Sequence, residues 1–221
     1  MTACALSIDD DRFGWDTHFG GSLDLVDYVV GRGGIVADYE AVLGTEFRLF
    51  DPNQGNYILE AFLSVRTSPK TEIMPMFHHV SRHLSDRAKR IPIAWNLLGA
   101  RVLHHTTVRA MTVDLDFEGG RTTERANVDY TWIGEAHAQL RAPINSRVSV
   151  FARAAGQLFG VDDTMFGRGH QTGAFAEGGL RLHGPGGTME LFLGIERRVD
   201  ADAIDLQTRN WVLAGFRLLS R

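Results

Sequence analysis

The sequence contains a single cysteine, six prolines and no surplus of basic residues among its 221 residues. Because a disulfide needs two thiols and a cysteine zinc cluster needs several, Cys4 alone excludes both kinds of crosslink within the chain. The formal net charge of −4 does not provide the electropositive surface that nucleic-acid binding requires. A nucleic-acid partner is therefore not expected.

Long apolar runs are also missing. No stretch approaches the roughly 18 consecutive apolar residues that a membrane-spanning helix needs. The first residues, MTACALSIDDDR, have neither the basic region nor the apolar stretch of a secretion signal. We interpret residues 1–12 as a disordered or truncated N-terminal segment, and residues 1–221 as one domain.

Hydrophobic alternation with a period of two dominates the rest of the chain. In residues 126–140 the even positions are apolar, small or aromatic, whereas most odd positions are polar. Phe151 and Phe159 are exceptions in the similar run at residues 148–159. This period predicts β-strands. The same alternation recurs in residues 35–49, 57–65, 111–117, 174–182 and 189–195.

Several of these runs exceed the roughly 5–6 residues of a strand in a soluble sheet and match the roughly 9–11 residues of a strand that crosses a bilayer. Their polar faces carry charges of both signs, as expected where acidic and basic side chains pair inside a narrow lumen. The sequence thus predicts an all-β fold, a closed antiparallel transmembrane β-barrel in the bacterial outer membrane. A soluble barrel with its apolar face inside is the alternative that periodicity leaves open. The predicted lumenal charge network consists of Glu40, Glu60, Arg153, Glu177 and Arg181.

Short turns alternate with longer polar connections between the predicted strands, which is typical of outer-membrane barrels. Eleven strands can be counted, beginning near residues 22, 35, 56, 71, 94, 108, 126, 147, 171, 188 and 209. Since bacterial barrels have even strand numbers, we expect a twelfth within residues 5–19, with ten strands as the second choice. Tyr130, Trp132 and Trp211 are predicted to anchor the barrel at the membrane interface.

One segment, MFHHVSRHLSDR at residues 76–87, concentrates imidazoles and hydroxyls near the end of a predicted strand. If Phe77 faces lipid, then His79 and Ser81 face lipid too, and so does Asn96 on the next strand. Residues i and i+2 share a strand face, so His79 can act as a general base toward Ser81. Asn96 can fix the tautomer of that imidazole. The pattern predicts a catalytic site of Ser81, His79 and Asn96 near the rim with the longer loops.

A barrel with His-x-Ser on one strand and Asn on the next resembles the outer-membrane phospholipase A family and, more distantly, the lipid A deacylases. The string HVSRHLSD at residues 79–86 also resembles a His-x-Ser-Ser-His-Leu-Gly-Asp string of an uncharacterised outer-membrane family. The first resemblance implies a lipid acyl-ester hydrolase with Ser81 as nucleophile, His79 as base and Asn96 as orienting residue. Calcium is implied by this resemblance alone, and the residues themselves predict no cofactor or metal. Arg82 and His83 stand where the phospholipases have Asn-Gly.

Other interpretations of the same residues remain open. His79 and Ser81 can be rim residues bonded to a loop or a lipid headgroup, and His78, His79, His83 and Asp86 can form a metal site. The barrel as a whole can be a non-catalytic scaffold, adhesin or assembly partner, or a narrow pore. The expected partners are membrane lipids, the outer-membrane assembly machinery and a second copy in a homodimer.

Overall fold

Antiparallel strands make up most of the computed structural model, which describes residues 1–7, 10–45, 53–84 and 92–220. In the described residues, no helix is both long and apolar enough to span a bilayer. The elements are β1 (Thr2–Ser7), β2 (Trp15–Tyr28), β3 (Gly31–Leu43), β4 (Gln54–Leu63), β5 (Val65–Ser68), β6 (Thr71–His83), β7 (Ile93–Val108), β8 (Met111–Ala126), β9 (Tyr130–Pro143), β10 (Val148–Val161), α1 (Asp163–Phe166), β11 (Gln171–Gly184), β12 (Gly187–Asp202) and β13 (Gln207–Ser220).

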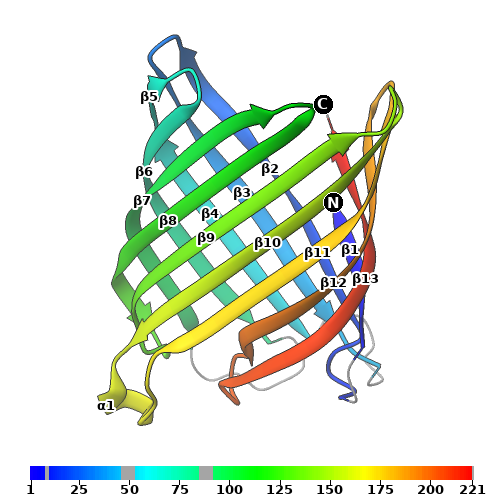
Figure 1. Cartoon of the computed structure of the whole chain (residues 1–221). Helices are drawn as coiled ribbons and strands as arrows, with labels where there is room; N and C mark the ends of the chain where they lie inside the picture. Colours follow the sequence, from blue (N-terminus) through cyan, green and yellow to red (C-terminus); the bar gives the residue numbers. More distant parts are fainter. Residues whose placement is uncertain (8–9, 46–52, 85–91, 221) are drawn as a thin grey trace.

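The sheet closes on itself through its first strand. β1 is hydrogen-bonded to β13 on one side and to β2 on the other, and β4 pairs with β6. β4 and β5 are interrupted only at Ser64, and both pair with β6, so together they form one position in the wall. The result is a closed antiparallel barrel of twelve strands (Figure 1), as the sequence predicts.

The position of the twelfth strand differs from the prediction. It is β1, at Thr2–Ser7, within a segment expected to be disordered or truncated. Residues 15–19, where the alternation suggested a separate strand, begin β2, which runs to Tyr28 without interruption. A strand of six residues is too short to show a convincing period, and β1 is defined by its pairing with both neighbours.

The outer face of the barrel is apolar and the inner face is charged. Trp132, Val150 and Leu180 are exposed on the outside, with 38–44% of their surface accessible. Arg153 faces the lumen, where it lies 3.2 Å from Glu177. A soluble barrel has the reverse arrangement, so this is the fold of an outer-membrane-type barrel.

The predicted charge network fills part of the lumen. Glu190, which is fully buried, lies 2.5 Å from Arg217 and 3.1 Å from Arg181. Glu60 accepts hydrogen bonds of 3.1 Å from both terminal nitrogens of Arg101. Glu40, Glu177 and Arg153 are in similar ion pairs. These contacts confirm the network, because each of its three predicted carboxylates, Glu40, Glu60 and Glu177, has a guanidinium partner from another strand.

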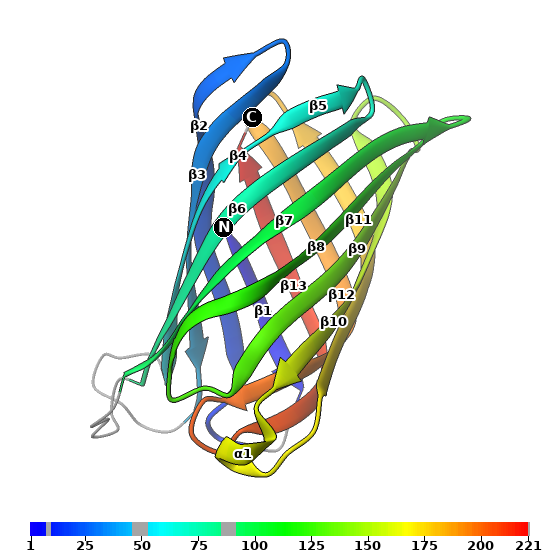
Figure 2. The same ribbon diagram turned by 90° about the vertical axis from the view of Figure 1, so that its left-hand side faces the viewer.

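Apolar side chains close the lumen at the end with the longer loops. Val199, near the end of β12, belongs to one buried cluster with Leu84, which follows β6, and Trp95, near the start of β7. Asp200 has a φ of +47°, and the pairing of β12 with β13 shifts register between Arg198 and Asp202. The ends of β12 and β13 therefore bend across the barrel (Figure 2). We call these bent strand ends and the apolar side chains packed against them the plug.

Two of the three predicted interface anchors are wrong. Tyr130 and Trp211 are 1% and 4% exposed and belong to apolar clusters inside the barrel. Gly160 pairs with Trp132 while Val161 pairs with Tyr130, so Thr131 is the extra residue of a bulge. The bulge turns Tyr130 inward and leaves Trp132 outside, because an inserted residue reverses the alternation of faces. On β13, Trp211 shares the inner face with Leu213.

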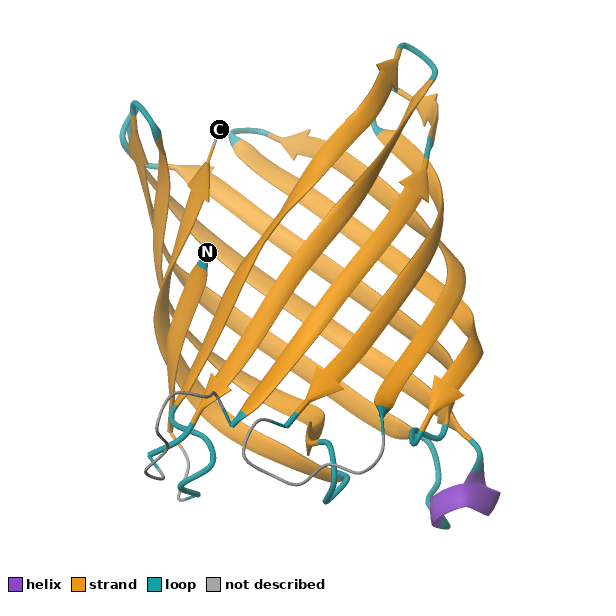
Figure 3. Ribbon diagram, turned by 180° about the vertical axis from the view of Figure 1, so that it is seen from behind, coloured by secondary structure: helices purple, strands orange, loops and turns teal. Residues whose placement is uncertain are grey.

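A loop arginine fastens the plug. Arg168, in the connection that carries α1 (Figure 3), donates four hydrogen bonds of 2.6–2.7 Å to Asp129 and Asp200. Both carboxylates are at most 1% exposed. Hydrogen bonding to Asp129 and Asp200 raises the pKa of the Arg168 guanidinium above its usual value. Since a buried carboxylate is costly without a counterion, this contact ties the loop to β12.

Replacing Arg168 should loosen the plug without unfolding the barrel wall. We expect Arg168→Met to destabilise this end by about 3–5 kcal/mol, because two buried carboxylates lose their partner. Amide hydrogen exchange in detergent should show lost protection in residues 162–170. Arg66→Met is the control, since its ion pair with Asp27 is exposed and worth about 0–1 kcal/mol. Equal protection in both variants would contradict the assignment.

The outer face should reject charge as a lipid-facing surface does. Leu193, near the middle of β12, is 67% exposed. Leu193→Arg should lower the free energy of unfolding by about 2–4 kcal/mol in lipid vesicles, because the guanidinium enters hydrocarbon. Urea titration in vesicles measures the change, with Leu193→Met as the control. An unchanged stability for the arginine variant would indicate that this face is not in contact with lipid.

Candidate functional site

His79 and Asn96 lie side by side on the outside of the barrel. They are direct partners in the register of β6 and β7, and His79 Nδ1 is 2.6 Å from Asn96 Oδ1. The Asn96 side-chain amide in turn donates a hydrogen bond of 3.0 Å to Glu124 on β8. Three neighbouring strands thus carry a continuous hydrogen-bonded chain from an imidazole to a carboxylate.

This chain determines the tautomer of His79. Because the Asn96 amide nitrogen donates to Glu124, the Asn96 oxygen faces His79 and can only accept. Nδ1 of His79 must then carry the proton, which leaves a lone pair on Nε2. An imidazole in this tautomer can take a proton from a hydroxyl group.

Ser81 stands between two histidines of the same strand face. It is two residues from His79 and two from His83, and residues at this spacing point to the same side. Its Oγ is hydrogen-bonded to His83 Nε2 at 3.1 Å. In the described contacts the sequence-predicted site is therefore assembled in part: Asn96 meets His79, while the Ser81 hydroxyl is directed to His83.

The surroundings of the site are apolar on one side and polar on the other. Tyr57 on β4 is the register partner of Ser81, and its ring lies 5.1 Å from that of His83. Farther from the loops, Phe77 and Leu98 are exposed on the outer face. β6 ends at His83, so the site lies where the apolar band ends. The site thus lies at the rim of the barrel wall, beside the exposed ring of Tyr57.

The alternative metal site does not form from the described residues. His78 faces the lumen and lies 3.4 Å from Glu60, whereas His79 and His83 face outward. Adjacent strand residues point to opposite sides of the wall, so the three imidazoles cannot converge on one ion. Asp86, the fourth predicted ligand, lies outside the described residues.

Sequence reasoning missed Glu124 and the role of His83. Glu124 is nearly thirty residues beyond Asn96, and only the pairing of β7 with β8 brings them together. That pairing contains an irregularity between Asn96 and Leu97, which the alternation of residue types does not reveal. His83 had a usable signal, because it has the same i, i+2 relation to Ser81 as His79.

Comparisons with known proteins are sparse. No family model matches the chain, and no curated protein matches it. Among solved structures, the crystal structure of the outer membrane protein Omp33 of Acinetobacter baumannii is similar over 99% of this chain and 95% of its own, with 9% sequence identity and a TM-score of 0.43.

Proposed function

We propose that the protein is a bacterial outer-membrane β-barrel that hydrolyses acyl-ester bonds of membrane lipids at its outer rim. Ser81 is the nucleophile, His79 the general base and Asn96 the residue that orients the base. The outer-membrane location is supported by the apolar exterior and by the short turns at one rim and longer loops at the other.

The hydrogen bond between His79 and Asn96 carries the proposal. Polar groups facing lipid are costly, and here an imidazole, an amide and a carboxylate lie together on the outer face, with the imidazole held in one tautomer. The bond leaves Nε2 of His79 as an acceptor two residues from a serine hydroxyl on the same face. Nucleophile, base and orienting group are the three parts that serine hydrolases share.

Rotation of one side chain completes the site. The Ser81 hydroxyl turns from His83 toward His79 Nε2 and gives up its proton as its oxygen attacks the ester carbonyl. The tetrahedral adduct expels the alcohol, which takes the proton from His79. Water then attacks the acyl-serine with His79 again as base, releasing fatty acid and restoring the Ser81 hydroxyl. Lipid reaches the site laterally, along the face that carries Phe77 and Leu98.

An assay of fatty-acid release distinguishes this proposal from the alternative, a non-catalytic outer-membrane barrel such as a scaffold, adhesin or assembly partner. In that case His79, Ser81 and Asn96 are a polar rim that contacts headgroups, and no fatty acid is released. A narrow pore is disfavoured by the apolar plug that includes Leu84, Trp95 and Val199.

Removing the nucleophile should abolish hydrolysis. Purified protein refolded in detergent is expected to release fatty acid from phospholipid or lipid A micelles, and Ser81→Ala should reduce release to background. His79→Ala should lower kcat by about 10²–10⁴-fold, the usual effect of losing a general base. Asn96→Ala should cause a smaller loss, since the base remains. Activity that survives Ser81→Ala would remove the proposed nucleophile.

A second pair of variants identifies the base. If His79 is the base, His83→Ala should keep most of the activity, because the variant removes the resting partner of the Ser81 hydroxyl and leaves His79 in place. His105→Ala is the matched control, an exposed histidine near the opposite rim that is hydrogen-bonded to Asp114. A full loss in His83→Ala together with an active His79→Ala would assign the base to His83 instead.

A further inference from the structure

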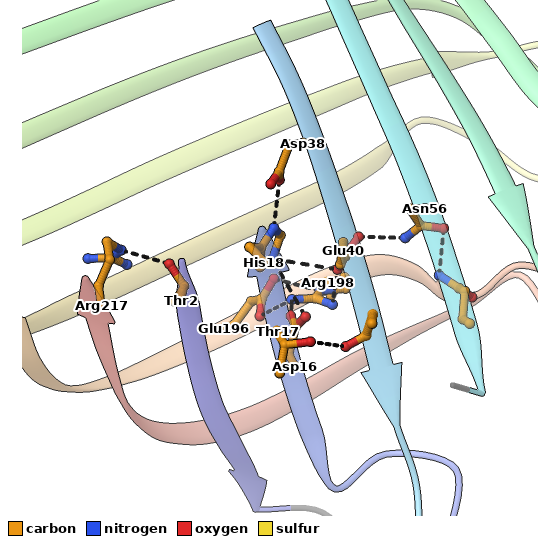
Figure 4. Close-up of polar contacts among 12 residues, drawn as sticks. Thr2, Asp16, Thr17, His18, Asp38, Glu40, Asn56, Glu196, Arg198 and Arg217 are labelled. Atoms are coloured by element: carbon orange, nitrogen blue, oxygen red, sulfur yellow. Dashed lines mark hydrogen bonds and ion pairs between the residues drawn. The ribbon is translucent and has the colours of Figure 1, made fainter. Parts of the chain in front are cut away.

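A second cluster of chemically active groups lies inside the barrel, on the wall formed by β2 and β3. Asp16 and His18 are two residues apart on β2, and Glu40 is the direct partner of His18 on β3. One ligating atom from each lies within 4.8 Å of the others. The three side chains point toward one another in the lumen (Figure 4).

His18 is oriented by a fourth residue. Asp38, which shares a strand face with Glu40, lies 2.8 Å from His18 Nδ1. A carboxylate can only accept, so Nδ1 carries the proton and the lone pair of a neutral ring is on Nε2. That atom is 3.5 Å from Asp16 Oδ1 and 3.9 Å from Glu40 Oε1. A carboxylate that holds the far nitrogen of an imidazole is the usual support of a metal-ligating histidine.

Asp16 offers an oxygen that is otherwise unused. Its side chain is 2% exposed, and its Oδ1 has no hydrogen-bond partner among the residues that the structure describes. Its Oδ2 accepts a hydrogen bond of 2.5 Å from Arg198, which also donates to Glu40 Oε1 at 2.7 Å. The ring of His18 faces this oxygen, with Nε2 3.5 Å from Oδ1, so the two atoms can bind one ion between them.

The charges of the cluster favour a cation. Asp16, Asp38, Glu40 and Glu196 contribute −4 when ionised, and Arg198, the guanidinium that contacts three of them in the described chain, contributes +1, which leaves −3. A divalent ion beside a neutral His18 reduces this to −1. Arg198 engages the far oxygen of Asp16 and leaves Oδ1 facing His18. It also donates to Glu40 Oε1, and a carboxylate oxygen has a second lone pair for an ion.

We propose that Asp16, His18 and Glu40 bind a divalent transition-metal ion, with Zn²⁺ as its representative, in the lumen. One imidazole with two carboxylates suits zinc and its first-row neighbours, whereas calcium and magnesium prefer oxygen ligands throughout. Asp38 orients His18, and Arg198 holds the two carboxylates. The side chains of His18 and Asp38 are 34% and 25% accessible, so the ion reaches the site from the lumen. The ion links β2 to β3 and is independent of the outer-rim hydrolase.

Metal titration of the refolded full chain tests the proposal. After chelator treatment and its removal, isothermal titration with Zn²⁺ in detergent should show one equivalent bound tightly. His18→Gln and Asp16→Asn should each weaken binding by at least tenfold. Asp38→Asn should weaken it by about 10–100-fold while keeping the stoichiometry, because it removes only the orienting partner. His137→Gln is the matched control, a lumenal histidine bonded to Glu135 on another part of the wall, and should bind as the unchanged protein does.

A measurement on the unchanged protein keeps the test decisive if a variant fails to refold. Co²⁺ should bind with a visible absorption spectrum of mixed nitrogen and oxygen ligation, and Zn²⁺ should displace it. Absence of binding below millimolar concentration would overturn the proposal and leave His18 as a protonated partner of the carboxylates. Binding that is unaffected by His18→Gln would overturn it as well. Loss of fatty-acid release in Ser81→Ala, with metal binding unchanged, would show that the two sites are separate.

Discussion

In hydrocarbon no water is available to satisfy the backbone, so each strand of a membrane-spanning sheet must be paired on both sides. Here that requirement is met by six residues, since β1 joins β2 to β13 and turns an open sheet into a ring. Closure then divides the side chains into two sets. Every second residue faces lipid or lumen, and the chemistry of each residue depends on which side of the wall it occupies.

The two sides treat polar groups in opposite ways. Inside, a charge is kept by a counter-charge on a facing strand, as Glu190 is by Arg181 and Arg217. Asp16 follows the same rule, with one oxygen beside Arg198 and the other 3.5 Å from the ring of His18. Outside, any polar group is an exception. The chain from His79 through Asn96 to Glu124 is such an exception, and its members are hydrogen-bonded to one another across three strands. The proposed hydrolase rests on this departure from the apolar character of the outer face.

The alternation of residue types was sufficient to predict the wall of the barrel and the faces of its strands. Trp132 and Arg153 lie on the predicted sides, and the parity of β6 and β7 alone was enough to predict that His79 and Asn96 meet. Prediction failed where a single residue interrupts the alternation of inward-facing and outward-facing side chains. The bulge at Thr131 turns Tyr130 inward, and the left-handed Asp200 helps bend the end of β12 across the lumen. Such features depend on pairing between strands distant in sequence, as does the contact of Asn96 with Glu124.

His18 and His79 show how one local geometry serves two kinds of chemistry. Each has Nδ1 beside an acceptor on the neighbouring strand, Asp38 in one case and Asn96 in the other. Each therefore has its Nε2 lone pair available within its own face. The charge of the acceptor and the side of the wall then decide the use. A carboxylate makes the ring a stronger ligand and suits a lumen rich in acidic oxygens. A neutral amide adds no charge on the lipid side, and in the proposed hydrolase the serine hydroxyl two residues away is the proton donor. The antiparallel pairing of strands produces both arrangements, His18 with Asp38 on the inner face and His79 with Asn96 on the outer face.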